Sequence, residues 1–83
     1  LKVIPNPTNG KWQISFEALE SDLAVVTLYN ADGNIVFSRN MEVYEGTNVL
    51  NMNCDDCENG IYTIVVKGEK INLAQKVNVI KNI

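Results

Sequence analysis

Apolar and polar residues alternate along most of this chain, and this alternation limits its fold more than any other feature. In the run 11–16, Trp12, Ile14 and Phe16 take every second position between polar residues. Because successive side chains of a β-strand point to opposite faces, the run predicts a strand with one buried face. No segment longer than ten residues has a clear 3.6-residue period, so we expect strands along nearly the whole chain.

Seven runs of this kind are separated by turn residues. They are 2–4, 11–16, 23–29, 34–41, 47–52, 60–67 and 70–79. Asp32 and Gly33 lie between the third and fourth runs, and this pair is typical of a tight β-hairpin. Short strands at such spacing predict an immunoglobulin-like antiparallel β-sandwich of about seven strands, with a small β-barrel as the alternative.

The segment 5–10, Pro-Asn-Pro-Thr-Asn-Gly, separates the first two runs. Each proline fixes its own φ and excludes the preceding residue from the α region. Asn9 and Gly10 tolerate positive φ. One strand must therefore end at Ile4 and the next must begin at Lys11. Taken alone, the segment predicts a turn without a reactive side chain.

The 83 residues suffice for one domain over 1–83, and no linker or low-complexity tract divides it. The net charge of −3 and the scattered Lys and Arg residues argue against nucleic acid binding, which needs a basic face. No apolar run of 18 residues exists, so we expect no membrane span. No secretory signal is present, and because the first residue is Leu1 rather than Met, we expect a piece of a larger protein.

Catalysis is disfavoured because the sequence contains no histidine. Histidine is the usual general base near neutral pH, so Ser-His-Asp and Cys-His devices are excluded. A hydrolase built on two carboxylates would need acidic residues that face each other across a cleft, whereas the acidic residues here lie mostly in predicted turns. We therefore expect no enzyme, no catalytic residue and no cofactor.

Cys54 and Cys57 form a C-x-x-C pair, a pattern found in redox couples, zinc sites and local disulfides. Zinc takes four ligands of Cys or His type, and this chain has only these two. A thioredoxin-like couple needs a βαβ setting, which is not predicted. A small loop disulfide and two packed thiols are the favoured interpretations, and we expect no metal.

Two other groups of residues have both a binding and a purely structural interpretation. The oxygen-rich turns 30–34 and 55–58 are candidates for Ca²⁺, but an EF-hand loop counted from Asn30 has Met41 where it needs a glutamate, and turn chemistry explains these residues. Four aromatic residues would form a sugar-stacking platform if they shared an exposed face; they are Trp12, Tyr29, Tyr44 and Tyr62. Trp12 lies on the apolar side of its run, which favours the core. Tyr44 is expected to be the most exposed of the four.

Four motifs, in order, resemble those of one family. They are VIPNPTNG at 3–10, VTLYNADGNIV at 26–36, NGIYTIVV at 59–66 and QKVNV at 75–79. Together they cover essentially the whole chain, which resembles the type A C-terminal sorting domain of proteins exported by the type IX secretion system (Por secretion system) of Bacteroidota. The resemblance implies an immunoglobulin-like sandwich at the C-terminus of a cargo protein, serving as a non-catalytic export signal.

The resemblance also implies partners and a location. The cargo domain, N-terminal to this one, crosses the inner membrane with a signal peptide. The outer-membrane translocon and its shuttle proteins then recognise the folded sorting domain. A sortase-like cysteine peptidase removes it at the cell surface, and cleavage is expected at or upstream of Leu1. The protein is thus expected to be secreted or on the cell surface, reached through the periplasm and the outer membrane.

The family pattern marks eight positions, named here the signature residues. They are Pro5, Asn6, Pro7, Gly10, Gly33, Gly60, Tyr62 and Lys76. The resemblance implies that the glycines mainly serve folding, and that Tyr62 packs or makes a tyrosine-corner hydrogen bond. Lys76 and the last strand are expected to be recognised by the translocon.

In one respect the chain departs from the family, which typically has leucines several positions before Gly60. Cys54 and Cys57 take those places here. The substitution implies a buried pair, and an exported protein meets oxidising conditions. We therefore expect a Cys54–Cys57 disulfide or two buried thiols. The alternative function is an accessory immunoglobulin-like module that binds glycan or protein for a secreted enzyme, which predicts an exposed aromatic platform or a large apolar patch.

Overall fold

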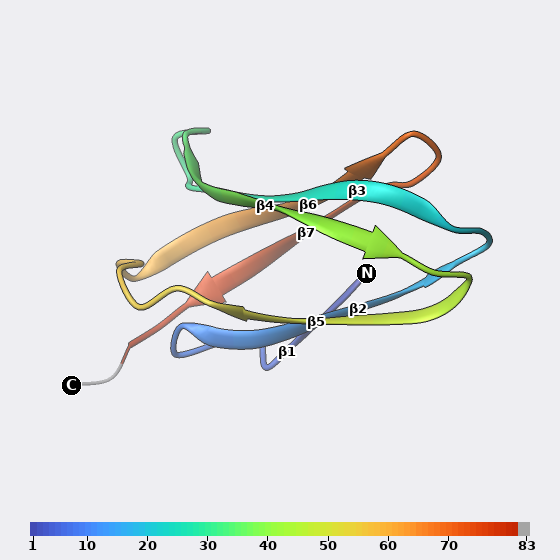
Figure 1. The fold of residues 1–83 in the computed structure, drawn as a ribbon. Coiled ribbons are helices and arrows are strands. Elements are labelled where there is room, and N and C mark those ends of the chain that lie inside the picture. The colour runs from blue at the N-terminus through green and yellow to red at the C-terminus, as the bar shows by residue number, and fades with distance from the viewer. Residues whose placement is uncertain (82–83) are drawn as a thin grey trace.

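The alternating runs form seven β-strands in two antiparallel sheets that pack face to face (Figure 1). The computed structural model describes residues 1–81. The strands are β1 (Lys2–Ile4), β2 (Lys11–Ala18), β3 (Asp22–Tyr29), β4 (Ile35–Val43), β5 (Gly46–Asn53), β6 (Gly60–Gly68) and β7 (Asn72–Val79). The predicted immunoglobulin-like sandwich of seven strands is confirmed. Over residues 1–81 no helix is long and apolar enough to cross a membrane.

The core lies between a three-stranded sheet, ordered β1-β2-β5, and a four-stranded sheet, ordered β4-β3-β6-β7. The apolar positions of β2 are buried as the alternation predicts: Trp12, Ile14 and Phe16 are 4%, 0% and 5% exposed. Val26 of β3 and Ile64 of β6 meet them from the other sheet and are fully buried. Each such side chain contributes roughly 1.5–3 kcal/mol through its removal from water.

Most strands extend past the predicted runs, because pairing with a neighbour continues beyond the last alternating residue. β2 continues to Ala18, which pairs with Gly46 at the start of β5. The predicted β3–β4 hairpin forms, and its turn is closed by the Gly33 N–H, which donates to the Asn30 carbonyl (3.0 Å). Alternation thus locates the centre of each strand, and pairing sets its ends.

The strands follow the long direction of the molecule, which measures 41 × 22 × 16 Å (Figure 1). The connections between them therefore gather at two ends. The end named here the Asn6 pole carries the β1–β2, β3–β4 and β5–β6 connections and the chain after β7, on the left in Figure 1. The opposite end, the Asp22 pole, carries the β2–β3, β4–β5 and β6–β7 connections.

Candidate recognition site

Asn6 joins the β1–β2 connection to the last strand. Its Nδ2 donates to the Lys76 carbonyl (3.2 Å), and its Oδ1 accepts from the Asn78 N–H (2.9 Å). A primary amide holds both a donor and an acceptor, so one side chain replaces two backbone groups of a neighbouring strand. Pro5 and Pro7 flank Asn6, and because proline has no N–H, neither competes with the Asn6 side chain as a donor to β7. Asn6 therefore occupies part of the outer edge of β7.

Thr8 continues this contact along the same edge. Its N–H donates to the Asn78 carbonyl (2.9 Å), and its carbonyl accepts from the Ile80 N–H (2.8 Å). The Thr8 side chain is buried, where its Oγ1 donates to the Lys11 carbonyl (2.6 Å) and accepts from the Gly10 N–H (3.2 Å). The sequence predicted a turn over 5–10. The structure shows that this turn also ties the three-stranded sheet to the edge of the four-stranded sheet.

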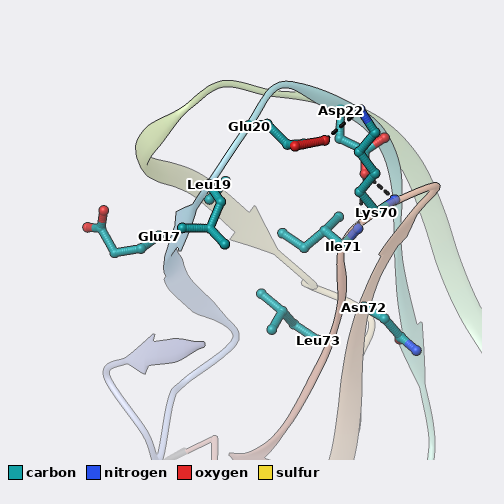
Figure 2. A pocket seen from close by; sticks show the side chains of 9 residues that line it. Glu17, Leu19, Glu20, Asp22, Lys70, Ile71, Asn72 and Leu73 are labelled. Carbon is teal, nitrogen blue, oxygen red and sulfur yellow. Dashed lines mark hydrogen bonds and ion pairs between the residues drawn. The ribbon is translucent and has the colours of Figure 1, made fainter.

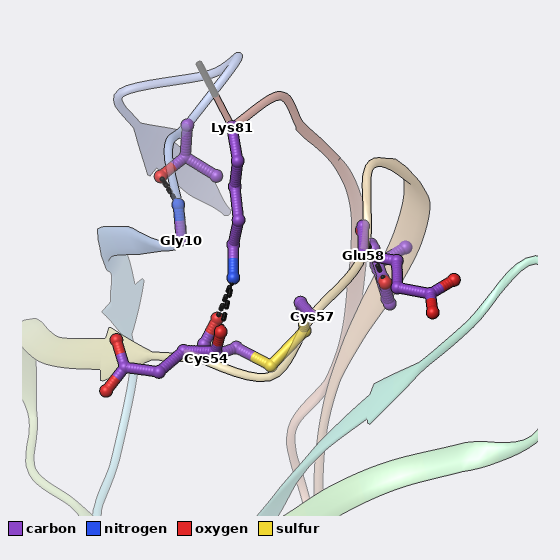
Figure 3. Close-up of a disulfide and its surroundings, with 8 residues drawn as sticks. Gly10, Cys54, Cys57, Glu58 and Lys81 are labelled. Carbon is purple, nitrogen blue, oxygen red and sulfur yellow. Dashed lines mark hydrogen bonds between the residues drawn. A yellow bond between two sulfur atoms is a disulfide. The ribbon is translucent and has the colours of Figure 1, made fainter. Parts of the chain in front are cut away.

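Gly10 lies where three segments meet (Figure 3). Its carbonyl accepts from the Cys54 N–H (2.8 Å), and its φ of +114° is one that residues with a Cβ rarely adopt. A Cβ at this position would lie 3.1 Å from the Cys54 carbonyl oxygen and 3.2 Å from Cε of Lys81. Lys81 in turn donates from Nζ to the carbonyls of Cys54 (3.2 Å) and Asp55 (2.5 Å). Glycine thus allows the β1–β2 turn, the β5–β6 connection and the chain after β7 to meet.

A disulfide joins Cys54 and Cys57 within the β5–β6 connection (Figure 3). Both residues are buried, at 6% and 5% exposed. A few residues further on, the Tyr62 hydroxyl donates to the Glu58 carbonyl (2.7 Å). This bond has the form of a tyrosine corner, which fixes the chain at the entry to a strand. The β5–β6 connection is therefore held covalently at one end and by Tyr62 at the other.

Gly33 and Lys76 border a shallow hollow on the outer face of the four-stranded sheet, together with Tyr29 and Ile61. Gly60, beside Ile61, begins the strand that pairs with β7. The structure thus brings all eight signature residues to the Asn6 pole, from two connections and two strands. They were named one by one from family motifs, and the topology makes them neighbours.

The Asp22 pole is organised by a residue that the sequence analysis did not single out (Figure 2). The Asp22 carboxylate accepts from the N–H groups of Leu23 (2.8 Å), Glu69 (3.2 Å), Lys70 (2.8 Å) and Ile71 (3.0 Å). These hydrogen bonds, led by that from Lys70, hold the pKa of Asp22 below its ordinary value of 3.8. Three of its four partners are remote in the sequence, so no local pattern could reveal its role in the β6–β7 turn.

Asn48 is a second residue that the sequence analysis missed, and it closes the β4–β5 turn at the same pole. Its side chain is 5% exposed. Its Oδ1 accepts from the Tyr44 N–H (2.9 Å), while its Nδ2 donates to the carbonyls of Tyr44 (2.8 Å) and Gly46 (3.2 Å). Tyr44 is exposed as predicted, and its hydroxyl donates to Glu42 (2.5 Å), which raises the pKa of Tyr44.

Neither an aromatic platform nor a metal cluster is formed by the residues that the structure describes. Trp12 and Tyr62 are buried in the core, and Tyr44 lies at the other pole. In the turn 30–34 the side-chain oxygen of Asn30 accepts from two backbone N–H groups, as turn chemistry predicts. Across residues 1–81 no three Cys, Asp or Glu side chains lie close enough to hold a metal ion.

The family model of the secretion system C-terminal sorting domain matches residues 2–81 of this chain. The chain belongs to this family. The resemblance drawn from the sequence motifs is therefore confirmed: the chain is a C-terminal sorting domain of type IX secretion. It marks proteins for export across the outer membrane to the cell surface or the medium. No curated protein and no solved structure matches the chain.

Members of the sorting-domain family are non-catalytic signal domains, and they interact with the type IX secretion machinery. A non-catalytic signal acts by being bound by the export machinery, so it must be carried by a surface of the domain. The Asn6 pole is the candidate surface of this sorting domain, since the signature residues gather there and hydrogen bonds join its segments.

Proposed function

We propose that the Asn6 pole is the surface through which the type IX translocon recognises this sorting domain. The observation that carries the proposal is the pair of hydrogen bonds from Asn6 to Lys76 and Asn78. They fix the β1–β2 turn against β7, so that residues from both ends of the sequence form one surface. Because that surface depends on long-range contacts, it exists only when the domain is folded.

In this proposal the domain has no catalytic activity and is the C-terminal part of a larger secreted protein. The translocon and its shuttle proteins bind the Asn6 pole, and a sortase-like cysteine peptidase cuts the chain at or upstream of Leu1. The position of β1 supports that cut, since β1 is an edge strand of the three-stranded sheet. A chain that enters through an edge strand stays accessible to a peptidase.

Export of a reporter tests the proposal. A reporter with a signal peptide is fused to residues 1–83 and expressed in a type IX host and in the same host without the translocon. We expect the reporter at the cell surface or in the medium of the first host, and in the periplasm of the second. Retention in the periplasm of both hosts would refute the proposal.

A further inference from the structure

The two outer faces of the sandwich differ in composition. On the three-stranded sheet the outward positions are mostly polar; they are Lys2, Ile4, Lys11, Gln13, Ser15, Glu17, Thr47, Val49, Asn51 and Asn53. On the four-stranded sheet, β3 and β6 direct Val25, Tyr29, Ile61 and Val65 outward. Val25 and Ile61 are 42% and 45% exposed. The outer face of the four-stranded sheet, named here the apolar face, is therefore the one suited to protein contact.

Two lysines stand on the apolar face. Lys67 of β6 lies beside Val25, and Lys76 of β7 lies beside Thr63. Neither pairs with a carboxylate within residues 1–81. The acidic residue among the outward positions of the four strands is Glu42, at the Asp22 pole, where it accepts from the Tyr44 hydroxyl. Lys76 lies toward the Asn6 pole and Lys67, the last residue but one of β6, lies toward the Asp22 pole. Although the domain has a net charge of −3, the outward positions of these four strands carry two lysines and one glutamate.

We propose that the apolar face binds a protein surface in which acidic residues stand beside apolar ones. In this arrangement a partner carboxylate meets Lys76, and an adjacent apolar side chain enters the hollow bordered by Tyr29 and Ile61. Lys67 receives a second carboxylate further along the face. Charge complementarity of this kind selects the partner, and burial of the apolar side chains stabilises the complex. The inference rests on the proposed function and names the chemistry of the translocon surface.

The same observations disfavour other occupants. A second copy of the domain would offer one carboxylate on the strands of this face, that of Glu42, against the two lysines of its neighbour, and Glu42 already accepts from the Tyr44 hydroxyl. A membrane surface is bound by clusters of four to eight basic residues, and this face has two on a domain of net charge −3. A glycan platform needs several exposed aromatic rings, whereas Tyr29 is the one aromatic residue within 1–81 that borders the hollow.

Photo-cross-linking in the reporter fusion identifies what covers the face. One variant carries Ile61→p-benzoylphenylalanine, and the matched control carries Val49→p-benzoylphenylalanine, which is exposed on the other sheet. We expect the first to join a translocon protein at a segment with Asp or Glu next to apolar residues, and the second to join none. Cross-links to lipid, to glycan, to a second copy of the domain or to a segment without acidic residues overturn the inference, as does the absence of any cross-link from position 61.

A charge swap then tests the predicted pairing. Lys67→Glu is expected to lower the secreted reporter about tenfold, and replacing the acidic residue of the cross-linked segment with lysine should restore it. Lys2→Glu makes the same change of charge on the other sheet, on β1, and is expected to leave secretion unchanged. Thermal melts of the purified domains check that all variants fold. Equal export of the two variants, or a swap that restores nothing, overturns the inference.

The two proposals fail in different ways. If the unmodified fusion stays in the periplasm, the proposed function is wrong. If the unmodified fusion is exported and Lys67→Glu is exported equally well, the Asn6 pole remains the candidate signal and only the assignment of the apolar face is wrong.

Discussion

A single carboxylate orders the β6–β7 turn of this sorting domain. Asp22 accepts from three consecutive N–H groups of the turn, those of Glu69, Lys70 and Ile71. Each of these groups faces the carboxylate because Asp22 begins β3, the strand that pairs with β6. Hydrogen bonds to the charged form favour that form, so the stabilisation depends on the ionised carboxylate.

The pH dependence of stability should show this. The pKa of Asp22 is lowered from 3.8 in the folded state, so its contribution is complete above pH 3.8 and is lost as pH falls through the folded-state pKa. We expect Asp22→Asn to lower the melting temperature at neutral pH and to flatten its decline as the pH falls below about 4. Thermal melts over this range measure both effects. Parallel pH profiles for the two proteins would contradict the role given to the carboxylate.

Gly68 is required by the same arrangement. A Cβ at this position would lie 2.5 Å from Oδ2 of Asp22 and 2.7 Å from the Leu23 carbonyl oxygen. We expect Gly68→Ala to lower the free energy of unfolding by about 1–3 kcal/mol, because the backbone of β3 must shift. Urea denaturation measures the change, and Ser38→Ala on the exposed part of β4 serves as the control, expected to stay within about 0.5 kcal/mol of the parent. Equal stabilities for both variants would contradict the close approach.

The β1–β2 connection acts on β7 as a strand would. An edge strand presents unpaired N–H and C=O groups, which other chains can pair with. β7 is such an edge, and the segment 6–8 covers it near Lys76 and Asn78 through the side chain of Asn6 and the backbone of Thr8. The turn that begins the sorting motif therefore also protects the end of the last strand.

Removal of the Asn6 amide should expose this part of β7. We expect Asn6→Ala to speed hydrogen exchange at the Asn78 N–H and to lower the free energy of unfolding by about 1 kcal/mol. The control is Asn9→Ala in the same turn, since Asn9 accepts only a long hydrogen bond from the Lys11 N–H (3.4 Å). Exchange measured by NMR at Asn78 should change in the first variant and not in the second. Unchanged exchange in both would show that Asn6 does not cover the edge.

The strands could be predicted from the sequence because alternation is a local signal. The alternation of Trp12, Ile14 and Phe16 predicts both their strand and its buried face, and the structure confirms both. The contacts of Asn6 and Asp22 could not be predicted, since each joins residues whose proximity depends on the completed topology. The signature residues were identifiable through family motifs, but their gathering at one pole is a consequence of how the sheets pair.

The molecule as a whole divides its tasks between its two ends. The Asp22 pole holds turns together through Asp22 and Asn48, neither of which belongs to the signature. The Asn6 pole holds the eight signature residues, the disulfide and the chain after β7. A surface built from separated segments is displayed only by folded protein, so under the proposed function a sorting domain presents its recognition surface only once it has folded.

Secretion of the reporter fused to residues 1–83 decides whether the Asn6 pole is the export signal. The variants are Lys76→Glu at that pole and Lys2→Glu on β1; each replaces +1 by −1 and so takes the net charge from −3 to −5. We predict that Lys76→Glu retains the reporter in the periplasm, that Lys2→Glu secretes it like the parent, and that both domains melt at the parent temperature. Secretion of the Lys76→Glu fusion at the parent level would contradict the claim that this pole carries the signal.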